Sequence, residues 1–244
     1  MAVAVNNAWQ TITAGTSGSS GEPSGTVTIS AGSDRMLVFG QIINQSGQLT
    51  ISTLTVGGQA ASYTRDYFVD NGSNDLQLQM HIWNEAAIAA MSGTTISYTD
   101  DDTYPATAGW SFGGWENVKQ EDPFTATVPV DEDNDLNGQT LNLTTTSTAN
   151  DYIILLGVDS SANRAPLTAD TLTRQQEYSV SNVAMAFFDG AGGDGTTTFS
   201  NDAVANSDIA AMSIVLVDVA ASSGHNVPNS MGGMTMNMSG GMSG

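Results

Sequence analysis

Two histidines and no cysteine leave this chain with few side chains suited to nucleophilic or acid–base chemistry. His81 alternates with Gln77 and Gln79 on what we expect to be the solvent side of a strand, and His225 lies near the C-terminus. Neither histidine has a serine or cysteine partner at a fixed spacing, and no G-x-S-x-G nucleophile elbow joins a strand to a helix. The sequence therefore predicts no hydrolase triad.

The carboxylates gather in turns instead of projecting from strands into a cleft. One cluster is the run Asp100 to Asp102, and a second runs from Asp131 to Asp135. Glu116, next to Trp115, is the single acid whose aromatic neighbour suits a glycosidase carboxylate. We expect Glu116 to be an exposed acid at a strand end, and we predict that the protein is not an enzyme.

Asp131, Asp133 and Asp135 have the alternate-oxygen spacing of a calcium loop. An EF-hand loop starting at Asp131 needs glycine at its sixth position and glutamate at its twelfth, where this chain has Leu136 and Asn142. The sequence leaves two alternatives, a weak structural calcium site at the three aspartates and a solvated acidic turn. No other cofactor is predicted.

Residues 221–244 form a low-complexity tail. From Ser222 onward the tail contains no Asp, Glu, Lys or Arg, and His225 is its one titratable side chain. It holds five of the 11 methionines, and we assign it as an interaction segment because methionine packs into irregular apolar grooves. The alternatives are a disordered end and a Cu(I) site formed by thioethers with His225. The methionines are Met231, Met234, Met236, Met238 and Met242.

Four aromatic residues raise the question of a sugar-stacking platform: Trp83, Tyr104, Trp110 and Trp115. Trp110 and Phe112 share a strand face by period two, so we expect them in the core. Trp83 and Trp115 are the two candidates for glycan contact, with core packing as the alternative.

Short apolar runs of β-forming residues recur from Trp9 to Asp218, separated by turns rich in Gly, Asn, Asp and Ser. Met36–Phe39, Tyr152–Leu156 and Ile214–Val217 are almost continuously apolar, which is typical of central strands covered on both faces. There is no strand–helix alternation and no repeat of fixed period, and only Glu85–Met91 clusters helix formers. The pattern predicts an all-β fold: an antiparallel two-sheet jelly-roll-type β-sandwich over residues 1–220, with one short helix in a loop.

The formal net charge is −20, from 25 acidic and five basic residues. Such a surface repels phosphates, so nucleic-acid binding is disfavoured. No run approaches the roughly 18 apolar residues that span a bilayer, which predicts no membrane insertion. The first residues lack the basic and apolar regions of the usual secretory signal.

Six segments in order resemble one recurrent module: SGTVTISAGSDRMLVFG, STLTVGGQAASY, LQMHIWNE, AGWSFGGWENVKQEDPF, NDYIILLGV and IAAMSIVLVD. The module is a jelly-roll β-sandwich domain shared by bacterial surface proteins and phage structural proteins. The resemblance covers about Ser24 to Asp218, and its matching residues are core and turn residues, including Gly57-Gly58 as a tight turn with positive φ. It implies a jelly-roll sandwich with a structural role and no catalytic motif.

Together these features predict a non-enzymatic structural protein on a virion surface, such as a phage capsid decoration or head-fibre protein. It would form a homo-oligomer, for example a trimer, and dock on other virion proteins through Val3, Val5 and the Met-rich tail. The alternative is a bacterial extracellular matrix or adhesin subunit at the cell surface, or a carbohydrate-binding module.

Overall fold

The computed structural model describes residues 1–14, 23–70, 75–101, 107–124, 130–133, 140–160, 167–180, 183–193, 195–201 and 208–219. These residues form sixteen strands in four sheets and one short helix, α1 (Glu85–Ala89). All strand pairs are antiparallel. The predicted all-β class and the single short helix in a loop are confirmed.

The N-terminal half contributes a five-stranded sheet and a three-stranded sheet, named here the inner and the outer N-terminal sheet. The inner sheet has the order β1-β8-β2-β6-β5, with bounds Ala4–Ala14, Thr107–Glu116, Met36–Gln45, Asp75–Trp83 and Tyr63–Val69. The outer sheet has the order β4-β3-β7, with bounds Gln59–Ala60, Ile51–Val56 and Ile96–Asp100.

The C-terminal half forms an inner and an outer C-terminal sheet of the same sizes. The inner sheet has the order β13-β14-β11-β16-β9, with bounds Thr173–Val180, Val183–Ala191, Tyr152–Ser160, Asp208–Leu216 and Val130–Asp133. The outer sheet has the order β10-β15-β12, with bounds Thr140–Thr145, Gly195–Asn201 and Leu167–Ala169.

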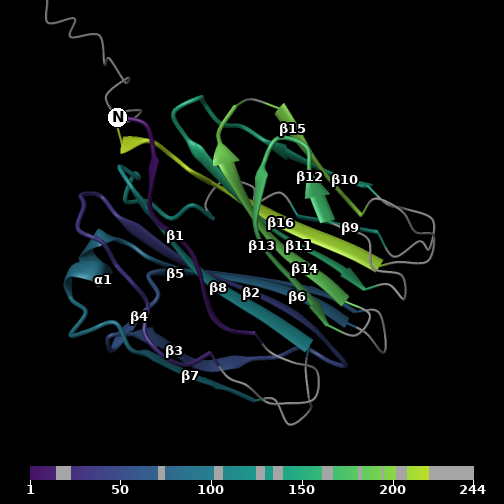
Figure 1. Ribbon diagram of the computed structural model, residues 1–244, viewed down its shortest axis with the longest axis horizontal. Helices are drawn as coiled ribbons and strands as arrows, with labels where there is room; N and C mark the ends of the chain where they lie inside the picture. The colour runs from purple at the N-terminus through teal and green to yellow at the C-terminus, as the bar shows by residue number, and fades with distance from the viewer. Residues whose placement is uncertain are drawn as a thin grey trace, which may run out of the picture.

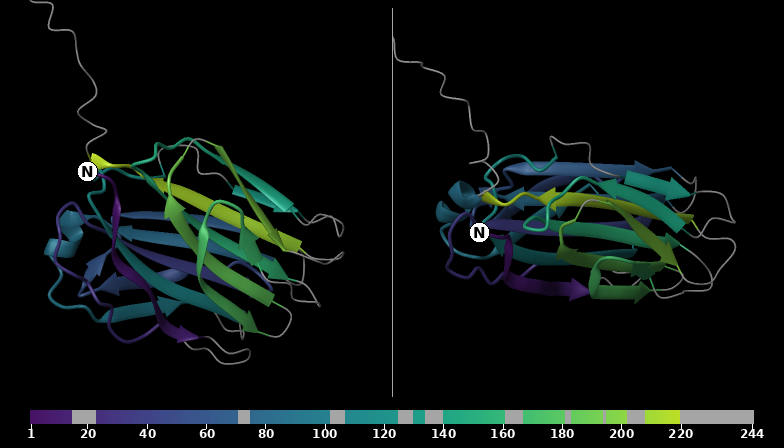
Figure 2. Two further views of the ribbon diagram at one scale, coloured as in Figure 1. Left: turned by 45° about the horizontal axis from the view of Figure 1, so that its top comes forward. Right: turned by 90° about the horizontal axis from the view of Figure 1, so that it is seen from above.

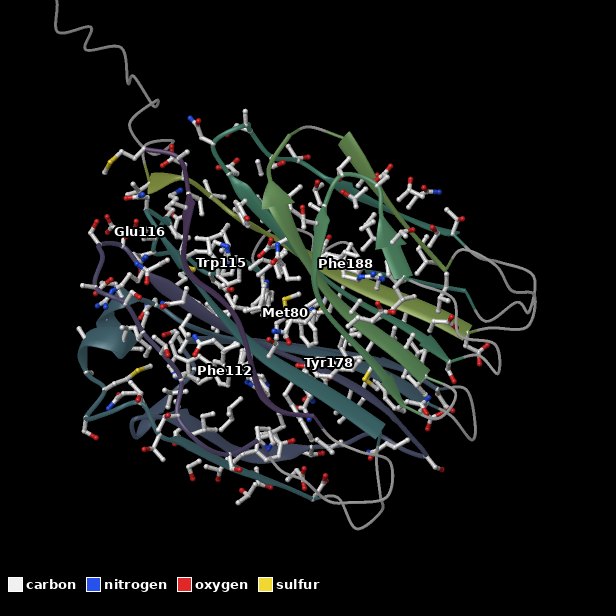
Figure 3. All side chains as sticks on the ribbon, viewed as in Figure 1. Met80, Phe112, Trp115, Glu116, Tyr178 and Phe188 are labelled. Carbon is white, nitrogen blue, oxygen red and sulfur yellow. The ribbon has the colours of Figure 1, made fainter. Side chains whose placement is uncertain are left out.

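The four sheets stack as layers in the order outer N-terminal, inner N-terminal, inner C-terminal and outer C-terminal (Figure 1). Three apolar clusters fill the three spaces between them. Phe112 lies between the two N-terminal sheets, Met80 and Trp115 lie between the two inner sheets, and Phe188 lies between the two C-terminal sheets (Figure 3). The sequence predicted two sheets, whereas the described residues form four. The two additional sheets cover the outer faces of the two inner sheets, which are therefore buried on both faces.

Strand β2 shows how the sequence encodes this burial. Met36, Val38 and Ile42 contribute to the cluster between the inner sheets, whereas Leu37 and Phe39 contribute to the cluster under the outer sheet. A strand with apolar side chains on both faces appears as a continuous apolar run, so the predicted central strands at Met36, Tyr152 and Ile214 are confirmed as β2, β11 and β16.

The two inner sheets are in close contact at a glycine. A Cβ atom on Gly40 of β2 would lie 2.6 Å from Cε1 of Phe187 and 2.9 Å from Cδ2 of Leu156, both in the inner C-terminal sheet. The two halves of the chain are therefore fitted to each other at the level of single methyl groups. The predicted Gly57-Gly58 turn between β3 and β4 is also confirmed, with φ of 56° and 79°.

The two halves have the same topology, although the sequence has no repeat of fixed period. Each inner sheet has a central strand, β2 or β11, between the last strand of its half, β8 or β16, and the second strand of a hairpin, β6 or β14. The edges are the first strand of the half, β1 or β9, and the first strand of that hairpin, β5 or β13. In the outer sheets, the pairing of β7 with β3 corresponds to the pairing of β15 with β12. The isolated bridge between Thr26 and Thr95 occupies the position that the pairing of β10 with β15 has in the other half. The chain is thus two stacked sandwiches, while their jelly-roll character stays a prediction.

Candidate functional site

The two tryptophans predicted to contact glycan are both in the interior, so this prediction was wrong for the protein as folded. Trp83 is fully buried, and its indole Nε1 donates to the carbonyl of Gln59 at 2.8 Å. Trp115 is 1% exposed and packs edge-on against Trp9 with ring centroids 5.3 Å apart. Both tryptophans lie at or near the end of a strand, and the sequence does not show that neighbouring sheets cover these positions. Trp110 and Phe112 are buried as predicted.

Of the two N-terminal residues predicted to mediate assembly, one is buried and one is exposed. Val3 is 7% exposed and belongs to the cluster between the inner sheets, so its assignment to assembly was wrong. Val5 is 45% exposed on β1. Strand β1 has irregular register with β8 beyond Val5, which changes the alternation of its side chains.

The exposed large apolar side chains among the described residues are Met1, Val5 and Val217, and they border one segment, residues 115–119. Val5 pairs with Trp115 across the sheet, the amide of Lys119 donates to the carbonyl of Val217 at 2.8 Å, and Asn117 donates to the carbonyl of Ala2 at 3.3 Å. We call Met1, Val5 and Val217 the apolar end. Figures 1 and 2 show the N-terminus beside the short yellow segment of chain that follows β16.

Strand β1 is held in place by a buried carboxylate of the C-terminal half. Asp189 is 2% exposed and accepts from Trp9 Nε1 at 2.8 Å, from Gln175 Nε2 at 2.8 Å and from the Tyr152 hydroxyl at 3.3 Å. Burial raises the pKa of Asp189 above its usual range and, with the neighbouring carboxylate, raises the pKa of Tyr152 to about 12. The contacts position β1 and the apolar end on the stacked sheets.

The acidic residues form no metal centre within the described part of the chain. No three His, Cys, Asp or Glu side chains converge there. Asp131 and Asp133 lie in β9, an edge strand whose side chains are outside the described set, and Asp135 is also outside the described residues. The weak calcium site therefore stays a prediction, tested by whether EDTA lowers the melting temperature and Ca²⁺ restores it.

Glu116 is half-buried at the end of β8 and accepts from Asn6 Nδ2 at 3.2 Å. Its described hydrogen-bond partner is an amide side chain, and Glu116 is not the fully exposed acid expected from the sequence. The tail with Met231, Met234, Met236, Met238 and Met242 lies outside the described residues, as does His225. Its role stays a prediction.

The polar face of β6 is where the structure differs most from expectation. Gln77 and Gln79 are 1% and 4% exposed and His81 is half-buried, because the outer N-terminal sheet and residues 48–51 cover the side predicted to face solvent. Burial lowers the pKa of His81 to about 4. The signal in the sequence was the presence of polar residues at three alternate positions, Gln77, Gln79 and His81, on one face of an otherwise apolar strand.

Within the described residues, no helix has the length and apolar character needed to cross a bilayer. No protein-family model, no curated protein and no solved structure matches the chain. The likeness to the jelly-roll module of bacterial surface and phage structural proteins therefore depends on the segments quoted above.

Proposed function

We propose that this protein is a non-enzymatic structural component of a virion surface that assembles with copies of itself and with other virion proteins. Assembly takes place through the apolar end and the adjacent uncharged tail. The observation that carries the proposal is the position of Met1, Val5 and Val217 around residues 115–119, next to Val219, after which the tail begins.

Charge supports this choice of surface. A chain with a net charge of −20 repels its own copies over most of its surface, and two such surfaces approach most easily where charge is absent. Residues 222–244 carry no Asp, Glu, Lys or Arg, and the nearby exposed side chains of Val5 and Val217 are apolar. Burying these groups against a partner stabilises an assembly by roughly 25 cal/mol per Å² of apolar surface.

The stacked sheets suit a structural role. Two sandwiches share one apolar interface, and a buried carboxylate with three hydrogen bonds joins β1 to the C-terminal half. Rigid attachment of β1 gives the apolar end a defined direction relative to the rest of the molecule, which repeated assembly on a shell requires.

The test compares two variants by light scattering coupled to size-exclusion chromatography and by electron microscopy. Val5→Asp combined with Val217→Asp, or deletion of residues 222–244, is expected to reduce oligomers or particles to monomers. Thr99→Asp, on the exposed face of β7, adds a like charge outside the apolar end and serves as the control. Assembly that survives both the double substitution and the deletion contradicts the proposal.

A further inference from the structure

Strand β1 lies at the edge of the inner N-terminal sheet, and its backbone ladder with β8 is irregular. The register shifts at three places along β1: between Val5 and Asn7, between Asn7 and Gln10, and between Thr11 and Ala14. Each shift interrupts the regular hydrogen bonds of an antiparallel pair. On its other side, β8 pairs with β2 over nine consecutive residues without a shift. Strand β1 therefore depends on its side chains for much of its attachment.

The principal anchor of β1 is Trp9, whose ring fills a socket made by both halves of the chain. Trp9 is 7% exposed, and its ring centroid lies 5.3 Å from those of Trp115 and Phe187. Its indole Nε1 donates to the Asp189 carboxylate at 2.8 Å. A Cβ on Gly113 of β8 would lie 3.1 Å from Trp9 Cδ2, so the lack of a side chain there makes room for the indole. Tryptophans seated in this way are enriched among the residues that dominate binding at protein interfaces.

Amide side chains of β1 supply further polar contacts. The Gln10 amide binds the backbone of Thr28, because its Nε2 donates to the carbonyl at 3.0 Å and its Oε1 accepts from the N–H at 2.7 Å. Asn6 Nδ2 donates to the carbonyl of Ala31 at 3.0 Å. Peptides that add a strand to a sheet edge bind in the same way, through backbone hydrogen bonds and side chains that enter pockets. Strand β1 is thus attached to the fold in the manner of a bound peptide.

The sequence of β1 and of the residues after it suits exchange between copies of the chain. No residue before Glu22 is charged, so in a chain with a net charge of −20 this segment meets little repulsion from another copy. Seven of the eight residues 15–22 are Gly, Ser or Thr, a composition typical of linkers. Fully extended, a connection of this length spans roughly 26–29 Å. That reach is sufficient for β1 to lie on an adjacent copy.

We propose that β1 of one copy pairs with β8 of a second copy, so that the assembly is held together by exchanged strands. The exchanged strand meets an identical socket, since every copy presents the same Asp189 carboxylate to Trp9. Exchange also places Val5 of the donor beside Trp115 of the acceptor, whose Val217 lies at the same end. The apolar end is then made from two chains. The inference rests on the proposed function, because it names β1 as the segment that links the copies.

Exchange competes with the pairing of β1 and β8 within one copy. A short connection gives the strand of the same copy an effective concentration on the millimolar scale. The contacts of β1 are the same in both arrangements, so crowding of the copies and apolar surface buried between them decide the balance. Exchange is therefore favoured where copies are concentrated, as they are on a shell, and is to be measured at high protein concentration.

The test uses single cysteine substitutions, because the chain has no cysteine of its own. Ala4→Cys and Glu116→Cys are placed on separate full-length chains, at positions that face each other across β1 and β8, within reach of a disulfide. The two chains are co-expressed, concentrated to the millimolar range and oxidised. Most of the oligomer is expected to carry a disulfide between positions 4 and 116 of different chains, identified by peptide mass spectrometry. Thr55→Cys with Ser97→Cys, which face each other across β3 and β7, is the matched control and is expected to give no link between chains.

If either variant of the first pair fails to fold, Thr11→Cys with Ser111→Cys, a second pair that faces across β1 and β8, takes its place. Light scattering coupled to size-exclusion chromatography measures assembly separately from linkage. Oligomers that lack the link between chains overturn strand exchange and leave the proposed assembly through the apolar end intact. Equal linkage in the control pair also overturns exchange, since the links then arise from random collisions. A protein that stays monomeric at millimolar concentration overturns both proposals.

Discussion

His81 makes the stability of this protein sensitive to mild acid. Its imidazole sits over Phe39 beneath the outer N-terminal sheet, and burial lowers its pKa from 6.5 to about 4. As the pH falls below 6.5 the unfolded chain takes up a proton at His81, whereas the folded protein does not until about pH 4. The free energy of unfolding therefore decreases as the pH falls from 6.5 toward 4, by about 2 kcal/mol at pH 5 and about 3 kcal/mol at pH 4.

The measurement is urea unfolding of the native protein and of His81→Gln at pH 7, 5 and 4. Glutamine is polar and does not titrate, so the difference in unfolding free energy between the two proteins isolates His81. Other groups cancel in this difference, including Asp189, whose raised pKa acts in the opposite direction because its contribution to stability is lost as the pH rises.

Relative to its value at pH 7, the difference should shift by about 3 kcal/mol in favour of His81→Gln at pH 4. In thermal unfolding this corresponds to roughly 6–12 °C in Tm for a chain of this size. A difference that stays constant from pH 7 to pH 4 would refute the reasoning, because His81 would then titrate alike in the folded and unfolded states. A direct check is the imidazole pKa measured by nuclear magnetic resonance.

Two further predictions concern the contact between the halves. Gly40→Ala places a methyl group against the Phe187 ring and should lower the free energy of unfolding by about 1–3 kcal/mol in urea titrations, while Gly93→Ala, which has no atom within 4 Å of its added Cβ, should not. Equal effects of the two substitutions would contradict the close packing of the inner sheets. Asp189→Ala leaves three donors without their acceptor and should cost about 3 kcal/mol or more, with a change in Trp9 fluorescence in the folded state. Unchanged stability would show that β1 is held by other contacts.

Strand character was predictable from sequence wherever apolar side chains recur at period two or fill a short run. The continuous runs at Met36 and Tyr152 correctly predicted strands covered on both faces. The number of sheets was not predictable in the same way, because burial on both faces does not tell how many further layers provide the cover. The shared topology of the halves also leaves no fixed period, since strand order is maintained by pairing partners that are distant in sequence.

The residues of the candidate site were harder to predict than the fold. Strand β6 has apolar Leu78 and Met80 on one face and Gln77, Gln79 and His81 on the other, which is the usual pattern of a half-exposed strand. Nothing local to β6 indicates that residues 48–51 fold over its polar face and pair with Gln77. Similarly, Val3 and Val5 look equivalent in sequence, but Val3 precedes β1 and packs into the cluster between the inner sheets, whereas Val5 lies within β1 and is exposed.

The stacking of two like sandwiches has a consequence for biosynthesis. The N-terminal half is synthesised up to Glu116, the end of β8, before any strand of the inner C-terminal sheet has been made. The inner N-terminal sheet therefore leaves the ribosome with the apolar side chains of Val38, Leu78 and Met80 uncovered. At about 5–20 residues per second, the roughly 100 residues that complete the cover take on the order of ten seconds to be synthesised. During that interval the surface can be met by a chaperone or by the C-terminal half of another nascent chain. Exchange of halves between neighbouring polypeptides on one polysome, the event that yields intertwined dimers, would have to occur within that interval.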